Sequence, residues 1–311
     1  MFSHGVEQPA FVPEQSIDGR RLHAGGLCDG SRRDRGRTVF VDELGNGSDY
    51  VRFRFGHVIR DTSRAADLTE RGVRVRKGDF TDPASLASAF EGATQVLIVS
   101  ANETGGAAVA HHAAAIDAAR TAGAQRILYT SHQGAAPNSL FAPMPDHAAT
   151  ENHLAQTGIP YTALRNGFYA STVPMLLGQA RATGELLAPA DGPVSWTTHD
   201  DLAEAAAIVL TKEGLFDGPT PPLTAPDALD LNEIAAILTQ HTGRTIRRVV
   251  VDDDEWTAGL IDHGVPAAQA AMLLGMFHAA RRGEFATTDT ALADLLGRPA
   301  AGVASILELS A

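Results

Sequence analysis

The sequence has little of several residue types, and each shortage excludes a class of protein. Only Cys28 is a cysteine among the 311 residues, so neither a disulfide framework nor a cysteine zinc cluster can form. The longest apolar runs, such as VLIVS and AAAIVL, are far shorter than the roughly 18 residues that a membrane span requires. Basic residues are outnumbered, with 25 Lys and Arg against 37 Asp and Glu and a formal net charge of -12. Such a charge repels the phosphate backbone of nucleic acids.

These shortages set the first expectations about the surroundings of the protein. The N-terminus lacks the continuous apolar segment of an export signal, and a single cysteine suits a reducing compartment. We therefore expect a cytoplasmic protein with no membrane and no nucleic-acid partner. We expect no metal site either, because His111 and His112 are adjacent and point to different sides of a helix, whereas helical metal ligands lie three or four residues apart.

From about residue 57 onward the sequence alternates short β-branched runs with alanine-rich stretches at helical spacing. This alternation predicts βαβ units around a parallel sheet, and therefore an α/β fold. The candidate strands are GHVIRD (56–61), VRVRKGDF (73–80), TQVLIVS (94–100), QRILYTS (125–131) and YTALRN (161–166). The segments DPASLASAFEG and GGAAVAHHAAAIDAARTAG are predicted to be crossover helices between them.

The second half of the chain carries clear helix and break signals. Capping residues around Thr198 predict a helix over about 200–212. The proline-rich stretch GPTPPLTAPDALD (218–230) is the strongest break in the sequence. Asp230 and Glu233 then have the spacing of a capping box. We predict an N-terminal extension over 1–21, a larger domain over 22–218 and a mainly substrate-binding lobe over 219–311.

Several segments in fixed order point to a known family. They are VIRDTSRAADLTERGVRVRKGDFTDPASLASAFEGATQVLIVS, AAAIDAARTAGAQRILYTS and TENHLAQTGIPYTALRNGFY. Together they resemble the NmrA-like branch of the atypical short-chain dehydrogenases/reductases, and most of all its bacterial quinone oxidoreductases of the QOR2 type. The resemblance implies a Rossmann-type doubly wound sheet with a smaller C-terminal α/β lobe. It also implies an NAD(P)H-dependent oxidoreductase that acts on a quinone or a similar electron-poor small molecule, with a homodimer as a possible assembly.

The family places a glycine loop at its first strand, where the backbone approaches the dinucleotide diphosphate. In this alignment GSRRDRG supplies Gly30 and Gly36, and GRTVFVDEL (36–44) is expected to be the following helix. The middle glycine is replaced by Arg33, whose side chain would crowd the diphosphate. The stretch is therefore either a damaged phosphate loop or an ordinary surface loop.

Further cofactor contacts are implied by the same resemblance. Arg60, at the end of the second family strand, would face the adenosine 2′-phosphate, so NADP(H) is favoured and NAD(H) is the alternative. The remaining positions implied to bind the cofactor are Asp79, Phe80, Ser100, Ala101, Asn102, His147, Asn166, Gly167 and Phe168. Arg60 could equally be a solvated charge at a strand end, and the others ordinary turn or core residues.

The usual catalytic pair of the wider superfamily, a Tyr followed by a Lys four residues later, is absent. The chain has only Lys77 and Lys212, and neither follows a tyrosine at that spacing. When the chain is aligned with the family, His147 takes the position of that lysine. We therefore expect direct hydride transfer to a stacked quinone, with His147 as the first candidate for proton donor and Tyr129 as the second, or with water as the proton source.

Two other functions are open at this stage. NmrA-like proteins include dinucleotide sensors that control a partner without catalysis, and a chain with an altered glycine loop could also bind no dinucleotide. Trp256, Met276 and Phe277 of the small lobe could cover a flat apolar substrate, or could be the core of that lobe.

Overall fold

A seven-stranded sheet forms the centre of the larger lobe in the computed structural model, which describes residues 15–17, 20–22, 38–44 and 52–309. In spatial order its strands are β12 (Gly218–Pro219), β8 (Tyr161–Asn166), β7 (Arg126–His132), β6 (Gln95–Ile98), β3 (Thr38–Leu44), β4 (Arg52–Ile59) and β5 (Arg74–Lys77). Each of the five strands predicted from the sequence is present, within a few residues of the expected bounds.

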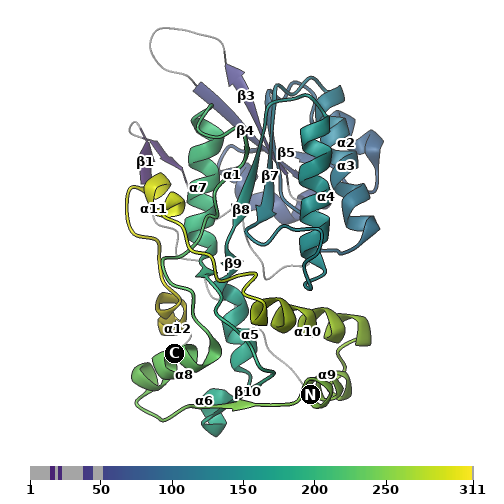
Figure 1. Ribbon diagram of the computed structural model, residues 1–311. Coiled ribbons are helices and arrows are strands. Elements are labelled where there is room, and N and C mark those ends of the chain that lie inside the picture. Colours follow the sequence, from purple (N-terminus) through teal and green to yellow (C-terminus); the bar gives the residue numbers. More distant parts are fainter. Residues whose placement is uncertain (1–14, 18–19, 23–37, 45–51, 310–311) are drawn as a thin grey trace.

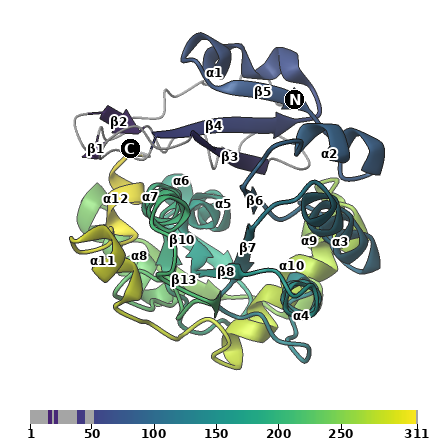
Figure 2. The same ribbon diagram turned by 90° about the horizontal axis from the view of Figure 1, so that it is seen from above.

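Helices cover both faces of this sheet, as Figure 2 shows. One face carries α2 (Pro83–Ala89), α3 (Gly106–Thr121) and α4 (Pro143–Gln156), and the other carries α7 (His199–Thr211). A short 3-10 helix, η2 (Thr62–Ala65), and α1 (Ala66–Glu70) connect β4 to β5. Buried apolar side chains fill the space on each face, such as Ile116 of α3 on one and Val209 of α7 on the other. The predicted doubly wound α/β fold is confirmed.

The direction of β3 departs from the prediction. The segment Thr38–Leu44 was expected to be a helix, but it is a strand that runs antiparallel to both β4 and β6, while all other neighbours in the sheet are parallel. Thr38 pairs with Val58 and Ile98, at the carboxyl ends of its two neighbours. The run Thr-Val-Phe-Val is β-branched and aromatic, which favours an extended strand over a helix.

The predicted phosphate loop lies outside the described residues. Gly30 and Gly36 both belong to the stretch 23–37, so their predicted role stays a prediction. Closer to the N-terminus, β1 (Gln15–Ile17) and β2 (Arg20–Leu22) form an antiparallel pair separate from the main sheet.

The helix caps read from the sequence are confirmed. Thr198 Oγ1 accepts a hydrogen bond from the backbone N–H of Asp201 at 3.3 Å, at the start of α7. The helix α8 (Leu231–Thr242) begins with a complete capping box, in which the side chains of Asp230 and Glu233 each accept from the other residue's backbone N–H at 2.9 Å.

The smaller lobe, below the sheet in Figure 1, is built on a second core. Its elements are α5 (Val173–Leu177), α6 (Ala180–Thr183), β10 (Glu185–Ala188), α8, β13 (Arg247–Val250), α9 (Asp253–Asp262), α10 (Ala267–Arg281) and α12 (Ala304–Leu309). At the junction of the lobes, β9 (Phe168–Tyr169) pairs in parallel with β11 (Trp196–Thr197). The 3-10 helix η3 (Ala170–Thr172) follows β9 directly and leads into α5. The second core unites residues of 168–196 with residues of 229–307, whereas α11 (Ala291–Leu296) packs on α7. The predicted boundary at residue 218 stays a prediction.

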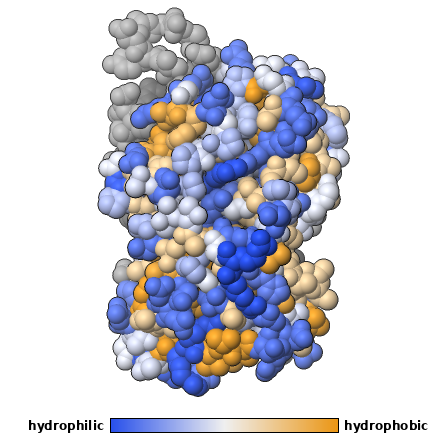
Figure 3. Space-filling model, in the orientation of Figure 1, coloured by the Kyte–Doolittle hydropathy of each residue, from blue (hydrophilic) through white to orange (hydrophobic). Residues whose placement is uncertain are grey.

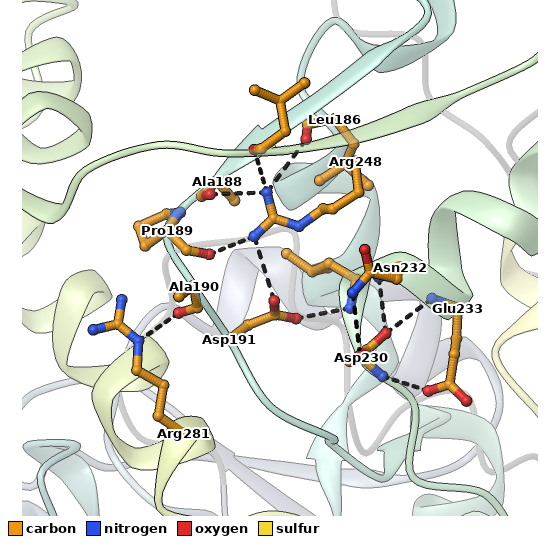
Figure 4. A network of polar contacts seen from close by, with 12 residues as sticks. Leu186, Ala188, Pro189, Ala190, Asp191, Asp230, Asn232, Glu233, Arg248 and Arg281 are labelled. Carbon is orange, nitrogen blue, oxygen red and sulfur yellow. Dashed lines mark hydrogen bonds and ion pairs between the residues drawn. The ribbon is translucent and has the colours of Figure 1, made fainter.

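A buried arginine fastens the strands of the small lobe together (Figure 4). Arg248 of β13 has a side chain only 4% exposed; it donates to the Ala188 carbonyl at 2.8 Å and to those of Pro189 and Val249. It also pairs with Asp191 at 3.3 Å, and the other Asp191 oxygen accepts from the Leu231 backbone N–H at 2.7 Å. These contacts of the two terminal guanidinium nitrogens fix β10, β13 and the start of α8 relative to one another, while Nε of Arg248 has no partner among the described residues.

The described part of the chain has a surface of mixed polarity. Every helix among the described residues is too short or too polar to cross a bilayer. Figure 3 shows a mixed polar and apolar surface, with an apolar patch on the small lobe where β10 lies. Leu187 of β10 is 49% exposed and Val250 of β13 is 62% exposed.

Candidate functional site

Most of the predicted site residues follow strands at the carboxyl edge of the sheet. Arg60 follows β4, Asp79 follows β5, Ser100 follows β6, and Asn166 ends β8. Strand order puts these strands in one row, β8-β7-β6-β3-β4-β5. The carboxyl edge of an open parallel sheet is where ligands bind in this architecture.

At one end of the row, Asp79 and Phe80 have different surroundings. The Asp79 carboxylate accepts from the backbone N–H and the hydroxyl of Thr81, at 2.9 and 2.8 Å. Partial burial opposes its ionisation, but these bonds and the positive charge of Arg60 lower the pKa of Asp79 overall. The Phe80 side chain is 5% exposed and belongs to the sheet core. Asp79 therefore lies at the edge of the site, while the Phe80 side chain packs in the core of the sheet beside it.

The loop after β6 is fastened by side chains from neighbouring elements. The backbone N–H of Ser100 donates to Thr130 Oγ1 at 2.9 Å, and that of Ala101 donates to His112 Nε2 at 2.8 Å. Asn102 follows as an exposed residue. The loop is thus held in place by β7 and α3 before any ligand binds.

Next along the row, His112, Tyr129 and His147 are joined by hydrogen bonds across α3, β7 and α4. Tyr129 Oη lies 2.8 Å from His147 Nδ1 and 3.4 Å from His112 Nδ1. His112 Nδ1 is also 3.0 Å from Thr150 Oγ1, which donates to the Asp146 carbonyl at 2.8 Å. Tyr129 is fully buried, whereas part of the His147 side chain stays accessible. His147 is therefore the member of this chain that a ligand can reach.

All three groups are neutral at neutral pH. Burial lowers the pKa of His112 to about 4. Burial, with the neighbouring His132 and His112, lowers the pKa of His147 well below its ordinary value. Burial also raises the pKa of Tyr129 above that of a free phenol. His147 would therefore act as an uncharged N–H donor and not as an imidazolium acid.

An apolar and aromatic floor lies beside His147. The ring of His132 stacks on that of His147 with centroids 6.2 Å apart, and meets Phe168 and Phe285 edge-on at 5.4 and 5.6 Å. His132 Nδ1 accepts from the Gly134 backbone N–H at 3.0 Å, and burial lowers the pKa of His132 to about 3. Phe168 is 6% exposed and Phe285 is fully buried, and both belong to the second core, so this cluster supports His147 from within the core.

The end of β8 contains an unsatisfied acceptor. Asn166 is 4% exposed, and its Oδ1 has no hydrogen-bond donor within the described part of the chain. Buried polar atoms without a partner are rare and often face a ligand or a water. A Cβ at Gly167 would lie 2.1 Å from Thr197 Oγ1, so packing requires glycine there, and the predicted cofactor contact of Gly167 stays a prediction.

The helix that carries His147 is anchored by a buried carboxylate. Glu151, one turn after His147 on α4, accepts from Ser131 Oγ at 2.6 Å and from Arg165 at 3.1 and 2.7 Å. Because Ser131 and Arg165 come from β7 and β8, α4 is fixed to the two strands that border the site.

The structure adds residues that the sequence did not single out for the site. His147 and Tyr129 were predicted together, whereas His112, Thr150 and His132 were not. His112 had been considered only as half of an adjacent pair, and His111 does point elsewhere, to Glu103 at 2.8 Å. Among the described residues no group of three or more metal-ligating side chains occurs. In the small lobe, Met276 and Phe277 belong to the core, and Trp256 packs on it.

Comparison with known proteins places the sequence in a reductase-rich group. The model of the NmrA-like family matches residues 49–294, a range that begins after Gly30 and Gly36. Quinone oxidoreductase 2 of Escherichia coli (strain K12) is 33% identical over 245 residues, which are 78% of this chain and 84% of that protein. An NAD(P)H azoreductase of Xenophilus azovorans is 29% identical over 247 residues, or 79% of this chain and 85% of that protein.

Solved structures agree with the sequence matches. The NADPH complex of the E. coli quinone oxidoreductase superposes with a TM-score of 0.74 at 31% identity, covering 81% of this chain and 89% of that one. The NADP(H) complex of Citrobacter sp. triphenylmethane reductase gives a TM-score of 0.74 at 30% identity, covering 82% and 89%.

Proposed function

The chain belongs to the NmrA-like family, and on that premise we propose that it is an NAD(P)H-dependent oxidoreductase that reduces a quinone or a similar electron-poor small molecule. The observation that carries the proposal is the neutral, partly accessible His147, held by Tyr129 beside the aromatic floor at the carboxyl edge of the sheet. An N–H donor next to an apolar surface suits a flat acceptor on which negative charge develops.

The residues present fit the two ends of a dinucleotide. Arg60 and Asp79 lie where the adenosine end would bind, and a guanidinium suits a 2′-phosphate, which favours NADPH. The unsatisfied Asn166 Oδ1 at the other end is a suitable acceptor for the amide N–H of a nicotinamide. When bound, the reduced nicotinamide supplies a hydride.

The middle of the cofactor site differs from the arrangement that the family resemblance implied. A diphosphate is usually held at the N-terminus of the helix that follows a parallel first strand. In this sheet the strand between β6 and β4 is β3, which runs antiparallel to both. The described residues contain no helix between β3 and β4 along the chain. We assign no diphosphate contact to this part of the chain.

The site residues would act by orientation and charge stabilisation. His147 would donate its N–H to the oxygen on which charge accumulates, and the buried rings of His132, Phe168 and Phe285 would hold His147 in place from within the core. Because aromatisation of a quinone offsets much of the cost of its anion, water can deliver the final proton. This chemistry needs no Tyr/Lys pair.

The names of the relatives support this substrate class. One is a quinone oxidoreductase, one an azoreductase and one a triphenylmethane reductase. Quinones, azo compounds and triphenylmethane dyes are all conjugated, electron-poor acceptors of hydride. We propose that this shared chemistry, and not a particular quinone, defines the substrate of the present chain.

The test is oxidation of NADPH by the purified protein with 1,4-benzoquinone, 1,4-naphthoquinone and an azo dye. We expect turnover with at least one acceptor, which is measured as the loss of the absorbance of reduced nicotinamide. His147→Phe keeps a flat ring but removes the donor and should lower kcat by roughly 100-fold, whereas His147→Gln keeps an amide N–H and should lose less.

Two results would contradict the proposal. Binding of NADPH without turnover of any acceptor would favour a dinucleotide sensor. Absence of binding by a folded protein, measured by calorimetry, would refute both the reductase and the sensor.

A further inference from the structure

The hydrogens in the chain of bonds that leads to His147 can be assigned one bond at a time. The chain starts at the Ala101 backbone N–H, which can only donate, so His112 Nε2 must accept and carries no hydrogen. A neutral His112 therefore has its hydrogen on Nδ1. That hydrogen is donated to Thr150 Oγ1, since the Thr150 hydroxyl hydrogen is itself donated to the Asp146 carbonyl.

The same reasoning fixes the hydroxyl of Tyr129. Its nearest partner is His147 Nδ1 at 2.8 Å, while His112 Nδ1 lies at 3.4 Å and the Thr150 side chain is a further hydrogen-bond neighbour. His112 Nδ1 already carries a hydrogen and cannot accept another. Because His147 Nδ1 is the nearest acceptor, at 2.8 Å, we assign the Tyr129 hydrogen to that bond, and a neutral His147 then carries its own hydrogen on Nε2.

We propose that Tyr129, with its own orientation set by His112, is a positioning residue that fixes His147 in the Nε2–H tautomer and so presents an N–H donor to the substrate. The value of this tautomer for catalysis rests on the proposed reductase function, but the tautomer itself does not. The role differs from that of a proton donor, because the hydroxyl of Tyr129 acts only through His147.

Burial supports this assignment of roles. Tyr129 is fully buried and Thr150 is 1% exposed, so neither can touch a substrate, while His147 is partly accessible. The Nε2 atom is on the opposite side of the imidazole from the Nδ1 atom that accepts from Tyr129. Within the described residues His147 Nε2 has no assigned hydrogen bond, so it is free to donate to a bound ligand.

Nitrogen NMR of histidine-labelled protein at neutral pH tests the tautomer without any assay of activity. The resonances of His147 are assigned by their loss in His147→Gln. In the wild type we expect an unprotonated Nδ1 and a protonated Nε2. A protonated Nδ1 in the wild type would overturn the proposal, and this measurement needs no variant at the tyrosine.

A pair of variants then tests what fixes the tautomer. Tyr129→Phe removes the donor and should move the Nδ1 resonance of His147 toward that of a mixture of tautomers. Tyr161→Phe makes the same change at the start of β8, at the opposite edge of the sheet, and leaves the Tyr129–His147 bond, so it should leave this resonance in place. An unchanged resonance in Tyr129→Phe, or an equal shift in both variants, would contradict the assignment.

Kinetics separate this inference from the proposed function. If the wild type reduces quinones, Tyr129→Phe should lower kcat roughly tenfold with NADPH affinity within about twofold of wild type, and Tyr161→Phe should change kcat by about twofold or less. A wild type that does not reduce any acceptor would refute the function, while the NMR result would still decide the tautomer. Equal loss of kcat in both variants would refute the positioning role of Tyr129.

Discussion

Arg60 is the residue at which cofactor choice can be tested most directly. It follows β4 at the carboxyl edge of the sheet, and its charge helps to lower the pKa of Asp79. We expect Arg60→Ala to weaken NADPH binding roughly tenfold or more and NADH binding by about twofold or less, because only NADPH has a 2′-phosphate for charge-assisted hydrogen bonds. Calorimetry with both nucleotides measures the two changes.

Arg64, four residues farther along in η2, offers a matched control. Arg64→Ala removes the same charge from the same side of the sheet, so its effect measures the general electrostatic contribution. Equal weakening of NADPH and NADH by Arg60→Ala, or equal effects of the two variants on NADPH, would remove Arg60 from the 2′-phosphate site.

Single residues of the site were only partly predictable from the sequence. His147 and Asn166 were both identified from their places in the family pattern. His112 and Thr150 could not be identified in this way, because their roles depend on how α3 and α4 pack against β7. Local spacing shows which side of a helix a residue is on, but not which side chain of another element it meets.

Among the elements, β3 shows that a local sequence pattern can predict a strand but cannot predict the direction of that strand in the sheet. The parallel strands and the capped helices were predictable because β-branched runs and capping residues act within a few positions. The run Thr-Val-Phe-Val is equally strand-like, but the family alignment required a helix there. Even a correct strand prediction would not have given its direction, which depends on the connections at both ends.

Engineered disulfides can test the direction of β3. In a chain with Cys28→Ser, the pair Thr38→Cys and Ile98→Cys should form a disulfide, because these residues are register partners in the antiparallel pairing of β3 with β6. The control pair Thr38→Cys and Gln95→Cys joins opposite ends of the two strands and should stay reduced. Mass spectrometry after mild oxidation distinguishes the pairs, and the reverse result would mean that β3 runs parallel to β6.

At the scale of the whole molecule, the site depends on contacts between distant parts of the chain. The aromatic floor combines Phe168 of β9 with Phe285, which follows α10. Gln133 links the end of β7 to both the Phe285 carbonyl and Ser195, at 3.1 and 2.9 Å. Because these contacts span the two lobes, the site should lose its geometry when either lobe unfolds.

Buried neutral histidines should make this whole structure sensitive to acid. His132 has a folded-state pKa of about 3, and His112 of about 4, both below the ordinary value of 6.5. As the pH falls below about 6.5 the unfolded chain takes up protons at these residues while the folded protein does not. Protons therefore favour the unfolded state, and stability falls with pH down to the folded-state pKa values.

His132→Asn isolates one part of this effect. Asn Oδ1 can take the place of His132 Nδ1 as acceptor for the Gly134 N–H, which is 3.0 Å away, but Asn does not titrate. Between about pH 6.5 and pH 5 one such histidine should cost about 2 kcal/mol of the free energy of unfolding. Urea unfolding at pH 7 and pH 5 should therefore show a difference smaller by about that amount in His132→Asn than in the wild type. An unchanged difference in His132→Asn would mean that His132 is not held neutral by the fold.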